Sequence, residues 1–465
     1  MRFVEAIEAG HMEEVVENMS DAGNYSAKRG DFTVPQEPQG QDKVEQGEKG
    51  EDAEKNIHNI PTMRVNDEVK EKHITPIPMP DDIDKNLQVK RERWCCWDSY
   101  VCPWEKFTRP GVLNLLKWNI CEKTHPIPGK EDLDRVLPVK SNMDKIKHPP
   151  ADKIQVTWIG HATMLVQMED MTILTDPVLD SFCGPIWPFG YKRHRNASCQ
   201  VKDIEKLDAV IISHNHYDHL EAKAVREINA KFKDVHWFVA GGTKAWFLAM
   251  DVEAKNLTEL DWWHGVEFNG VKFICTPSQH WCQRCIFDLN TCLWCSWVVK
   301  SSKHSFYFAG DTGYYENLFK KIGEKYGPFD LAGIPIGAYT PRYITKYQHV
   351  DPVEAVKIHE DVQSNMSVGI HWGAFALTNE PFLEPPRLVK EAMERNGKDC
   401  SKFISVDIGE TWVVGDQREE SKFMKCEADK EENACNKSIG SWNGEYQEQL
   451  PFAEFTHRLS MYFPY

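Results

Sequence analysis

The sequence predicts a mixed α/β fold that carries metal-binding residues at the ends of its strands. Apolar and β-branched runs alternate along the chain with stretches of helical character. The run at residues 208–213 leads directly into the pattern H-x-H-x-D-H, formed by His214, His216, Asp218 and His219. Three imidazoles and a carboxylate so close together would lose hydration without compensation unless a cation lay among them. This density of ligands favours two adjacent metal ions.

The expected elements alternate along the chain. Strands are expected at residues 154–166, 172–175, 209–213, 237–240, 271–276, 293–299, 305–309, 331–336, 368–371 and 403–406. Helices are expected at residues 221–230, 243–250, 316–324, 353–362 and 386–394. The last two helices begin at or beside prolines, which the first turn of a helix tolerates.

The dense motif can begin two metal sites but can complete neither. Neutral imidazole and carboxylate are ligands that suit zinc, which keeps an open position in catalytic sites. In a loop that leaves a strand, His214 and His216 can face one way while Asp218 and His219 reach a second point nearby. A binuclear centre therefore requires further histidine or aspartate at later strand ends.

Three later strand ends supply such residues. His280, Asp311 and His371 each lie just past an apolar, β-branched or aromatic run, where a strand delivers a side chain to the rim of a sheet. Taken singly, each is more simply a capped strand end or a hydrogen-bonded histidine. Taken together after one dense motif, they indicate a single centre built from several strand ends.

Blocks of sequence around the candidate ligands extend well beyond what metal binding requires. Gly-His-Ala lies within the block 157–163, and Thr-Asp-Pro lies within the block 174–177. Further blocks stand at residues 278–282, 308–314, 327–332, 334–339, 346–352 and 371–373. The first two blocks resemble the metallo-β-lactamase superfamily, and the others are similar to the family of N-acylphosphatidylethanolamine-hydrolysing phospholipase D. The resemblance runs from about residue 94 to residue 415.

This resemblance implies the metallo-β-lactamase fold, a four-layer αββα sandwich with a binuclear metal site at the strand ends. It also implies a ligand set for two zinc ions. One ion would be held by His214, His216 and His280, and the other by Asp218, His219 and His371, with Asp311 between them. Asp176 would hydrogen-bond a ligand imidazole, since a metal-bound histidine needs its other nitrogen satisfied. Alternatively, Asp176 is an ordinary turn residue before Pro177.

The implied reaction is hydrolysis of a phosphodiester. Two metal ions suit displacement at phosphorus, because they generate hydroxide near neutral pH and clamp the attacking and leaving oxygens. By resemblance, a metal-bridging hydroxide would attack N-acylphosphatidylethanolamine and release N-acylethanolamine and phosphatidic acid.

The same resemblance implies roles for individual residues in that reaction. The catalytic residues would be Asp218, Asp311 and His349, with Gln348 and His349 lining the headgroup site. His349 would protonate the leaving group, or else it is a structural histidine before a helix. Gln283 stands where the family carries a lysine, so this chain lacks that positive charge.

Three other functions would fit a related centre. A sugar-phosphate lactonase shares the Gly-His-Ala opening but would not need the tryptophan-rich segment before the core. A nuclease would want a strongly basic surface, whereas this chain has a net charge of −16, so we expect no nucleic-acid partner. A scaffold without activity should have lost ligands, and none of the ligand positions is missing.

Composition predicts one catalytic domain with extensions. Residues 1–85 are expected to form an acidic, largely disordered N-terminal extension, because the first 60 residues carry 14 acidic and 6 basic side chains. Such a segment cannot bury enough apolar surface to offset its ordering entropy. Residues 86–150 are expected to form a tryptophan-rich, lipid-facing segment and linker, 151–415 the catalytic domain, and 416–465 an acidic and aromatic C-terminal extension.

An apolar, tryptophan-bearing segment at residues 111–120 has Lys117 as its only charge. It could lie in a membrane interface, or it could be a helix packed on the sandwich. The basic run at residues 192–195 could meet phosphate headgroups, or it could be a solvated face. The resemblance favours a membrane phospholipid substrate, peripheral membrane association and a possible homodimer.

The N-terminus does not look like a signal peptide, because glutamates occupy positions where an apolar stretch would be. No run approaches the ~20 apolar residues of a spanning helix. We therefore expect an intracellular protein, not secreted, that is peripheral on the cytosolic face of membranes. Its 14 cysteines fit reduced thiols there. Cys282, Cys285, Cys292 and Cys295 have the paired spacing of a zinc ribbon, but the short gap between the pairs favours packed free cysteines.

Overall fold

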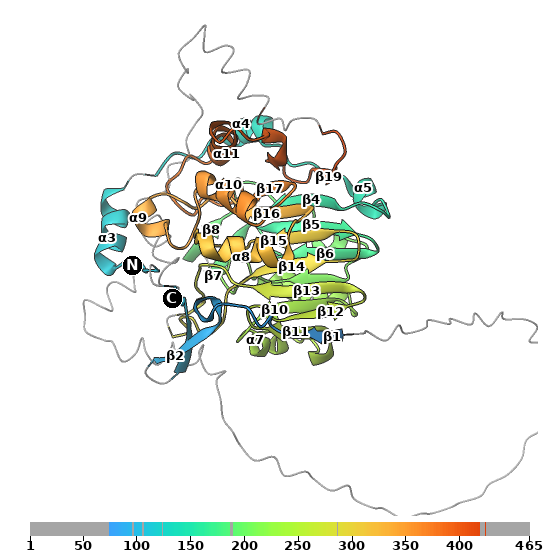
Figure 1. Cartoon of the computed structure of the whole chain (residues 1–465). Coiled ribbons are helices and arrows are strands. Elements are labelled where there is room, and N and C mark those ends of the chain that lie inside the picture. Colours follow the sequence, from blue (N-terminus) through green and yellow to red (C-terminus); the bar gives the residue numbers. More distant parts are fainter. Residues whose placement is uncertain are drawn as a thin grey trace, which may run out of the picture. The chain divides into compact units, whose positions relative to one another are not determined.

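Two β-sheets form the centre of the described part of the chain (Figure 1). The computed structural model describes residues 74–94, 97–104, 107–122, 124–186, 189–285, 287–418 and 424. Strands in the middle of both sheets are largely apolar and buried along their whole length, as in β5 (Thr163–Met168) and β16 (Leu331–Pro335). Such runs need cover on both faces of a sheet.

The larger sheet has the strand order β1-β12-β13-β14-β15-β16-β17-β18. Its other strands are β1 (Ile74–Ile77), β12 (Gly265–Phe268), β13 (Val271–Thr276), β14 (Ser296–Lys300), β15 (Ser305–Phe308), β17 (Ser367–Ile370) and β18 (Phe403–Ile404). The smaller sheet has the order β11-β10-β9-β6-β5-β4-β19. Its other strands are β4 (Gln155–Gly160), β6 (Met171–Thr175), β9 (Ala209–Ile211), β10 (His236–Ala240), β11 (Leu257–Leu260) and β19 (Thr411–Val413).

The two sheets pack face to face through their apolar side chains. Phe238 on β10 and Phe273 on β13 stack with ring centroids 4.0 Å apart, although they belong to different sheets. At Gly333 on β16 the sheets approach so closely that a Cβ atom would lie 2.6 Å from the sulfur of Met164 on β5. A residue larger than glycine would therefore require the buried Met164 side chain to move.

Helices cover the outer face of each sheet. On the larger sheet, Leu318 and Phe319 of α8 and Val356 of α10 join the same core cluster as the strands. On the smaller sheet, Phe247 of α7 packs on Trp237 of β10 with ring centroids 5.3 Å apart. The covering helices are α8 (Glu316–Tyr326), α10 (Pro352–Asp361) and α11 (Pro385–Arg395) on one side, and α6 (Ala222–Lys231) and α7 (Lys244–Ala249) on the other. This is the expected four-layer αββα sandwich.

The start of α10 follows directly from its sequence. Asp351 accepts a hydrogen bond from the backbone N–H of Glu354, and the Glu354 carboxylate accepts one from the N–H of Asp351. Pro352 occupies the first turn, where no backbone donor is needed. The cap ends the preceding loop at a fixed point, and that loop carries Gln348 and His349.

Parallel strand pairs bring the candidate ligands to one edge of the sandwich. β6 and β9 are parallel neighbours in the smaller sheet. β15, β16 and β17 are parallel neighbours in the larger sheet. The carboxyl ends of parallel strands meet at a shared edge, and His214, Asp311 and His371 follow β9, β15 and β17 within three residues. The same edge therefore receives side chains from both sheets.

Several elements differ from their expected bounds. Residues 154–166 do not form one strand, because a turn at His161 and Ala162 separates β4 from β5. β14 begins at Ser296 rather than at residue 293. β1 pairs with β12, so residues 74–77 belong to the larger sheet and the expected boundary at residue 85 falls inside the folded part. Most of the expected extensions, 1–73 and 425–465, lie outside the described residues.

Smaller elements surround this sandwich. They are the hairpins β2 (Lys90–Trp94) with β3 (Trp97–Val101) and β7 (Phe182–Ile186) with β8 (Phe189–Lys192), and the helices α3 (Val112–Cys121), α4 (Lys130–Val136), α5 (Met143–Lys147) and α9 (Arg342–Thr345). In the part of the chain that the structure describes, no helix combines the length and the apolar character needed to cross a membrane.

Candidate metal centre

The loop after β9 presents four of the expected ligands from one short turn. The backbone N–H groups of His219 and Leu220 both donate to the carbonyl of His216, at 3.1 and 2.9 Å. This turn directs His214 and His216 to one side, and Asp218 and His219 to the other. The motif thus begins two groups of donors, as its spacing predicts.

The first group consists of His214, His216 and His280. The Nε2 of His214 lies 2.8 Å from the Nδ1 of His216, and the Nε2 of His280 lies 3.2 Å from the same Nδ1. The backbone carbonyl of Gln348 fixes the His280 ring, because it lies 2.9 Å from Nδ1 and leaves Nε2 facing the group. Three ring nitrogens therefore converge from two loops.

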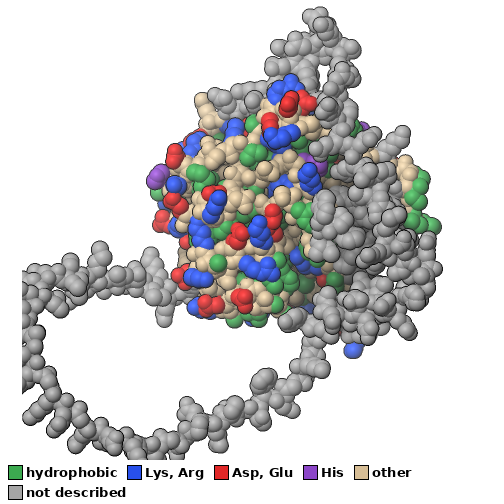
Figure 2. Space-filling view, turned by 180° about the vertical axis from the view of Figure 1, so that it is seen from behind, with side chains coloured by type: hydrophobic (Ala, Val, Ile, Leu, Met, Phe, Trp, Pro, Cys, Tyr) green, Lys and Arg blue, Asp and Glu red, His purple; other side chains and the backbone are tan. Residues whose placement is uncertain are grey.

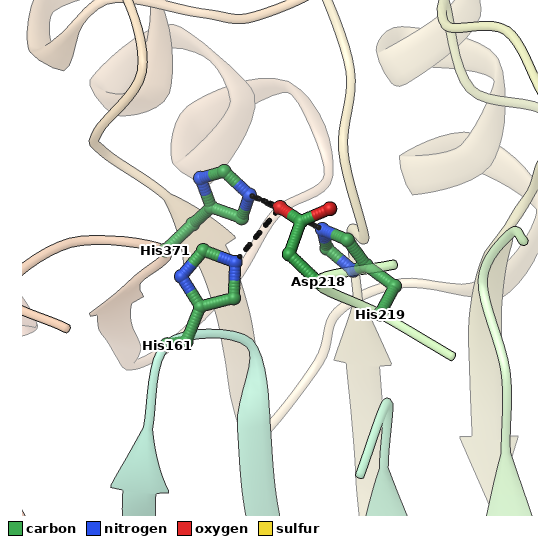
Figure 3. A group of neighbouring side chains, drawn as sticks. All are labelled: His161, Asp218, His219 and His371. Atoms are coloured by element: carbon green, nitrogen blue, oxygen red, sulfur yellow. Dashed lines mark hydrogen bonds and ion pairs between the residues drawn. The ribbon is translucent and has the colours of Figure 1, made fainter. Parts of the chain in front are cut away.

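The second group consists of Asp218, His219 and His371, together with His161 (Figure 3). The Nε2 atoms of His219 and His371 each lie 3.5 Å from the Oδ2 of Asp218. The Nε2 of His161 lies 3.1 Å from the same oxygen. One carboxylate oxygen therefore faces three imidazoles, two from strand ends and one from the turn between β4 and β5.

Asp311 lies between the two groups. Its Oδ2 is 3.1 Å from the Nε2 of His219, and its Oδ1 is 3.1 Å from the Nε2 of His371. The same Oδ2 is 3.9 Å from the Nε2 of His214 and 3.7 Å from that of His280. Asp311 is the carboxylate that reaches both groups, and it is almost completely buried.

Asp176 holds ligand side chains of this centre in place through hydrogen bonds. Its Oδ2 lies 2.7 Å from the Nδ1 of His219, and its carboxylate also accepts from the backbone N–H and the hydroxyl of Ser213. The hydroxyl of Ser213 in turn lies 2.9 Å from the Nδ1 of His214. Asp176 and Ser213 therefore hold imidazoles from both groups with their Nε2 atoms pointing inward.

The electrostatics of the centre are those of a site that needs positive charge. Burial opposes the ionisation of Asp311, but the neighbouring imidazoles of His219 and His371 hold the pKa of its carboxyl well below the usual range. Burial opposes protonation of His371, yet Asp311 and Asp218 raise its pKa to about 9. For His280, burial wins and lowers the pKa to about 3. Burial also opposes protonation of His219, yet Asp311 and Asp218 hold its pKa well above the ordinary histidine range. Without metal, the two carboxylates thus favour protonated imidazoles beside them.

Those protons cannot satisfy all of the ring nitrogens that converge in the two groups, whereas metal ions would bind them as ligands. The Nε2 atoms of His219 and His371 lie 3.1 Å apart, so two protonated rings face each other with like charge. In the first group, the Nδ1 of His216 lies 2.8 Å from the Nε2 of His214 and 3.2 Å from that of His280, and one proton cannot satisfy all three nitrogens. Imidazole nitrogens and carboxylate oxygens at these spacings are the ligands of zinc and similar divalent ions. The residues present fit a centre of two ions.

A pocket opens over the centre. Its floor is His216, Asp218 and Asp311, and its wall includes the β7–β8 hairpin. The lining also includes Cys183, Gly184, Pro185, Gly190, Tyr191, Tyr217, Trp281, Gln283, Gln348, His349 and Leu377. The pocket thus joins the metal-binding side chains to a partly apolar surface.

Gln348 and His349, the residues expected to line the headgroup site, both line this pocket. The Nδ1 of His349 lies 3.8 Å from the Oδ2 of Asp311. The side-chain amide nitrogen of Gln348 is buried without a hydrogen-bond partner. Gln283 lines the pocket too, and its amide donates to the carbonyl of Cys285 at 2.8 Å.

The basic run at residues 192–195 is not a phosphate-binding face. Arg193 is buried and donates to the carbonyls of Val178 and Asp180 at 2.5 and 3.0 Å. Arg195 is buried and donates to the carboxylate of Asp134 at 2.6 Å. Because their donors serve this chain, two of the three cations that were expected to meet headgroups are structural.

Two residues of the centre were missed from the sequence. His161 stands beside the second group, and its signal is the Gly-His-Ala opening in a stretch that looks like a continuous strand. Arg284 donates to the carbonyls of Asn215 and Leu220, at 2.7 and 2.8 Å, and so joins both ends of the metal-binding loop. Nothing in the sequence pattern marks Arg284, because its partners are backbone atoms.

None of the paired cysteines is a member of a metal-binding group among the described residues. Cys282 and Cys295 are buried, and their thiols lie 3.5 and 3.4 Å from the backbone carbonyls of Leu293 and Ser213. Cys285 is exposed. These contacts are those of separately packed thiols.

A sandwich of two sheets with histidines and aspartates at its strand ends defines a member of the metallo-β-lactamase superfamily, and the Beta-lactamase superfamily domain matches residues 171–372. A Caenorhabditis elegans protein named N-acyl-phosphatidylethanolamine-hydrolyzing phospholipase D 1 is 41% identical over 326 residues, which cover 66% of this chain and 90% of that protein. This chain belongs to the family of N-acylphosphatidylethanolamine-hydrolysing phospholipase D, as its motifs predict.

The chain is also similar to two further proteins. A Saccharomyces cerevisiae protein of the same name, described as mitochondrial, is 34% identical over 247 residues, which are 52% of each chain. A solved metallo hydrolase from the archaeon Ignicoccus hospitalis is 20% identical, covers 57% of this chain and 100% of its own, and has a TM-score of 0.43.

Proposed function

We propose that this chain is a phospholipase D that uses two zinc ions to hydrolyse N-acylphosphatidylethanolamine to N-acylethanolamine and phosphatidic acid. The observation that carries the proposal is the pair of donor groups joined by Asp311 on the floor of the pocket. A phosphodiester needs stabilisation of negative charge on several oxygens during attack. Family membership supports the choice of substrate among the phosphodiesters.

The chain would hold one ion with His214, His216 and His280 and the other with Asp218, His219 and His371. Two divalent ions would activate a water molecule near neutral pH and neutralise charge on the phosphate oxygens. Asp311 contacts members of both groups, so it would fix them at one mutual position. Asp176 would keep the His219 ring in the tautomer that presents Nε2 to the centre.

His349 would contribute a hydrogen bond to the phosphate or the leaving oxygen. Burial lowers its pKa to about 3, so the ring is neutral at physiological pH. A neutral imidazole has one N–H, which can donate a hydrogen bond. It lacks the additional proton of the imidazolium form, which a histidine acting as a general acid transfers to the leaving group. The low pKa therefore argues against the expected role of His349 as a general acid, and favours hydrogen bonding from the pocket wall.

The lipid would reach the pocket from the side of α3. Leu115 and Trp118 of this helix are buried against Trp281 and Ile344, and Trp281 also lines the pocket. The opposite face of α3 is apolar yet exposed, with Leu113 at 81% and Ile120 at 73% relative exposure. The buried face agrees with the expectation of a packed helix, and the exposed apolar face supports the proposal of a place in a membrane interface.

An exposed apolar helix face beside a phospholipid pocket supports peripheral membrane association. We propose that α3 rests in the interface of a phospholipid membrane on its cytosolic face. Acyl chains could then stay in the apolar layer while the headgroup enters the pocket. A homodimer is part of the same proposal and would be visible as the mass of the purified protein in solution.

A lactonase or a nuclease remains the alternative class. Figure 2 shows acidic and basic side chains interspersed over one face of the described part, without a broad basic field. Such a surface does not attract a polyanion as nuclease surfaces do. The exposed apolar face of α3 has no role in hydrolysis of a small soluble lactone.

The deciding experiment incubates zinc-replete protein separately with four substrates. These are N-acylphosphatidylethanolamine, phosphatidylcholine, a sugar-phosphate lactone and single-stranded DNA, with Asp311→Asn as the inactive control. We expect phosphatidic acid and N-acylethanolamine from the first substrate and little turnover of the others. Absence of phosphatidic acid from the wild-type reaction would overturn the proposal, and turnover of the lactone or the DNA would select the alternative.

A further inference from the structure

His161 occupies a strained position at the tip of the turn between β4 and β5. Its φ angle is +56°, in the left-handed region that residues with a Cβ adopt only at a cost. The side chain is 1% exposed, so the strain is not relieved by freedom in solvent. Strain at a buried polar residue beside a functional centre invites the question of what the side chain does there.

The ring of His161 points at a candidate metal ligand. Its Nε2 lies 3.1 Å from the Oδ2 of Asp218, closer than the Nε2 atoms of His219 and His371, which are both 3.5 Å away (Figure 3). His161 and His371 lie side by side with ring centroids 4.1 Å apart. His161 therefore touches the second group without belonging to the dense motif or to a later strand end.

The backbone of His161 supports the same group. Its carbonyl accepts a hydrogen bond from the backbone N–H of His371 at 3.0 Å. It also accepts one from the indole nitrogen of Trp158 at 2.8 Å. His371 itself has a φ angle of +62°, so this contact holds a second strained residue in place. The turn thus positions His371 through its main chain and Asp218 through its side chain.

The contacts also determine which nitrogen of His161 carries the proton. The Oδ2 atom of an ionised carboxylate can only accept, so Nε2 must donate to it. If Nδ1 carried the proton instead, this buried N–H would have no hydrogen-bond partner. The lone pair of Nε2 would then face a lone pair of the Asp218 Oδ2. An Nε2 that carries this proton is not available to bind a metal ion.

We propose that His161 is a positioning residue of the second metal group, which donates from Nε2 to Asp218 and orients that carboxylate toward His219 and His371. A carboxylate oxygen has two lone pairs, so Oδ2 can accept from His161 and still face a cation. This role rests on the proposed metal centre. It makes His161 a partner of a ligand rather than a fourth protein ligand of its own.

The test compares His161→Met with His161→Gln. Both side chains are about as long as histidine and keep a Cβ at the strained position, but only glutamine can donate to Asp218. Metal-free protein is titrated with Zn²⁺ and, separately, with Co²⁺ against a competing chelator, and the visible absorption of bound Co²⁺ reports the ligand geometry. His280→Ala, which removes a donor from the first group, identifies the binding step that belongs to that group.

We expect His161→Met to weaken the step of the second group about ten- to a hundredfold, as for other partners of metal ligands. The first step should stay within about twofold of wild type, and His161→Gln should recover most of the loss. The Co²⁺ spectrum of the second step should change in the Met variant and not in the Gln variant.

Three results would overturn the role. They are unchanged affinity for both ions in His161→Met, equal weakening of both steps, and a Gln variant as weak as the Met variant. Thermal unfolding of the metal-free proteins shows whether each variant folds, and His161→Ala replaces the Met variant if that one does not. Failure of wild-type protein to bind two ions would instead refute the metal centre itself, which separates the two proposals.

Discussion

The Nδ1 of His219 lies 2.7 Å from the Oδ2 of Asp176, and neither side chain has any exposed surface. The carboxylate also accepts the backbone N–H of Ser213 at 2.7 Å. Burial raises the pKa of Asp176, while His219 and Ser213 act to lower it. A buried carboxylate in this position sets the orientation of an imidazole and increases its basicity.

Replacing Asp176 with Asn should therefore weaken metal binding without removing a ligand. The amide keeps the shape of the carboxylate but loses its charge, so His219 becomes a poorer ligand. We expect metal affinity or turnover to fall about ten- to a hundredfold. Chelator competition measures the affinity. Asp180→Asn is the control, because Asp180 is part of neither donor group; wild-type affinity in Asp176→Asn would contradict the role.

Asp311 and His280 should differ in how many ions they affect. Asp311 approaches His219 and His371 in one group and His214 and His280 in the other, whereas His280 belongs to the first group alone. We expect Asp311→Asn to reduce binding of both ions and His280→Ala to reduce mainly one. Metal analysis after dialysis gives the stoichiometry. Equal stoichiometry in both variants and in wild type would refute the assignment.

Much of the fold could be predicted because most of its strands are buried, largely apolar runs and its helices alternate with them. β13, β16 and α8 fall close to their expected ranges. β1 was missed because four residues at a sheet edge carry too little pattern to stand out, and its pairing with β12 is a long-range contact. The turn that contains His161 was missed because the residues on both of its sides are equally apolar and buried.

The candidate site was predictable where one side chain recurs at strand ends, as at His280 and His371. It was not predictable where a side chain donates hydrogen bonds to backbone carbonyls of its own chain. Arg193 resembles a headgroup-binding cation in sequence, yet it donates to carbonyls inside the protein. Arg284 has the same kind of partners around the metal-binding loop. Such contacts depend on tertiary packing, which local sequence does not encode.

Arg284 should be important for the stability of that loop. Its guanidinium donates to Asn215 and Leu220 and lies over the ring of Tyr217 at 4.0 Å. Lysine cannot reproduce this planar fork. We expect Arg284→Lys to lower the free energy of unfolding by about 2 kcal/mol and to weaken metal binding. Chemical denaturation measures the first effect. The exposed Arg226 on α6 provides the control Arg226→Lys, and a loss of equal size there would contradict the specific role.

Removal of the metal should make stability depend on pH. In the metal-free protein, burial opposes protonation of His371 but Asp311 and Asp218 raise its pKa to about 9, above the ordinary histidine value near 6.5. The protonated ring therefore contributes stability that is fully present below about pH 6.5 and is lost as the pH rises through about 9. We expect the Tm of metal-free protein to fall across this window.

Metal-loaded protein should not show that decrease, because its ligand imidazoles are already deprotonated. Metal binding near neutral pH should accordingly release protons. Calorimetry of zinc binding in buffers of different ionisation enthalpy measures the number released. A Tm that is equally independent of pH with and without metal, or binding without proton release, would contradict the expected protonation of the centre.

The exposed face of α3 should govern binding to membranes rather than hydrolysis itself. Leu113 and Ile120 point away from the buried contacts of Leu115 and Trp118, so their replacement by serine leaves the packing of the helix intact. Each leucine or isoleucine that enters an apolar layer contributes about 1.5–3 kcal/mol when fully buried. We expect the double variant to bind phosphatidylcholine vesicles at least about tenfold more weakly, measured by sedimentation.

The turnover of detergent-dispersed N-acylphosphatidylethanolamine by this double variant should stay close to wild type. Leu248→Ser on α7 provides a control at another exposed apolar position. Unchanged vesicle binding in the double variant would show that α3 is not the membrane contact, whereas an equal loss with dispersed substrate would place the two residues in the path of the lipid to the pocket.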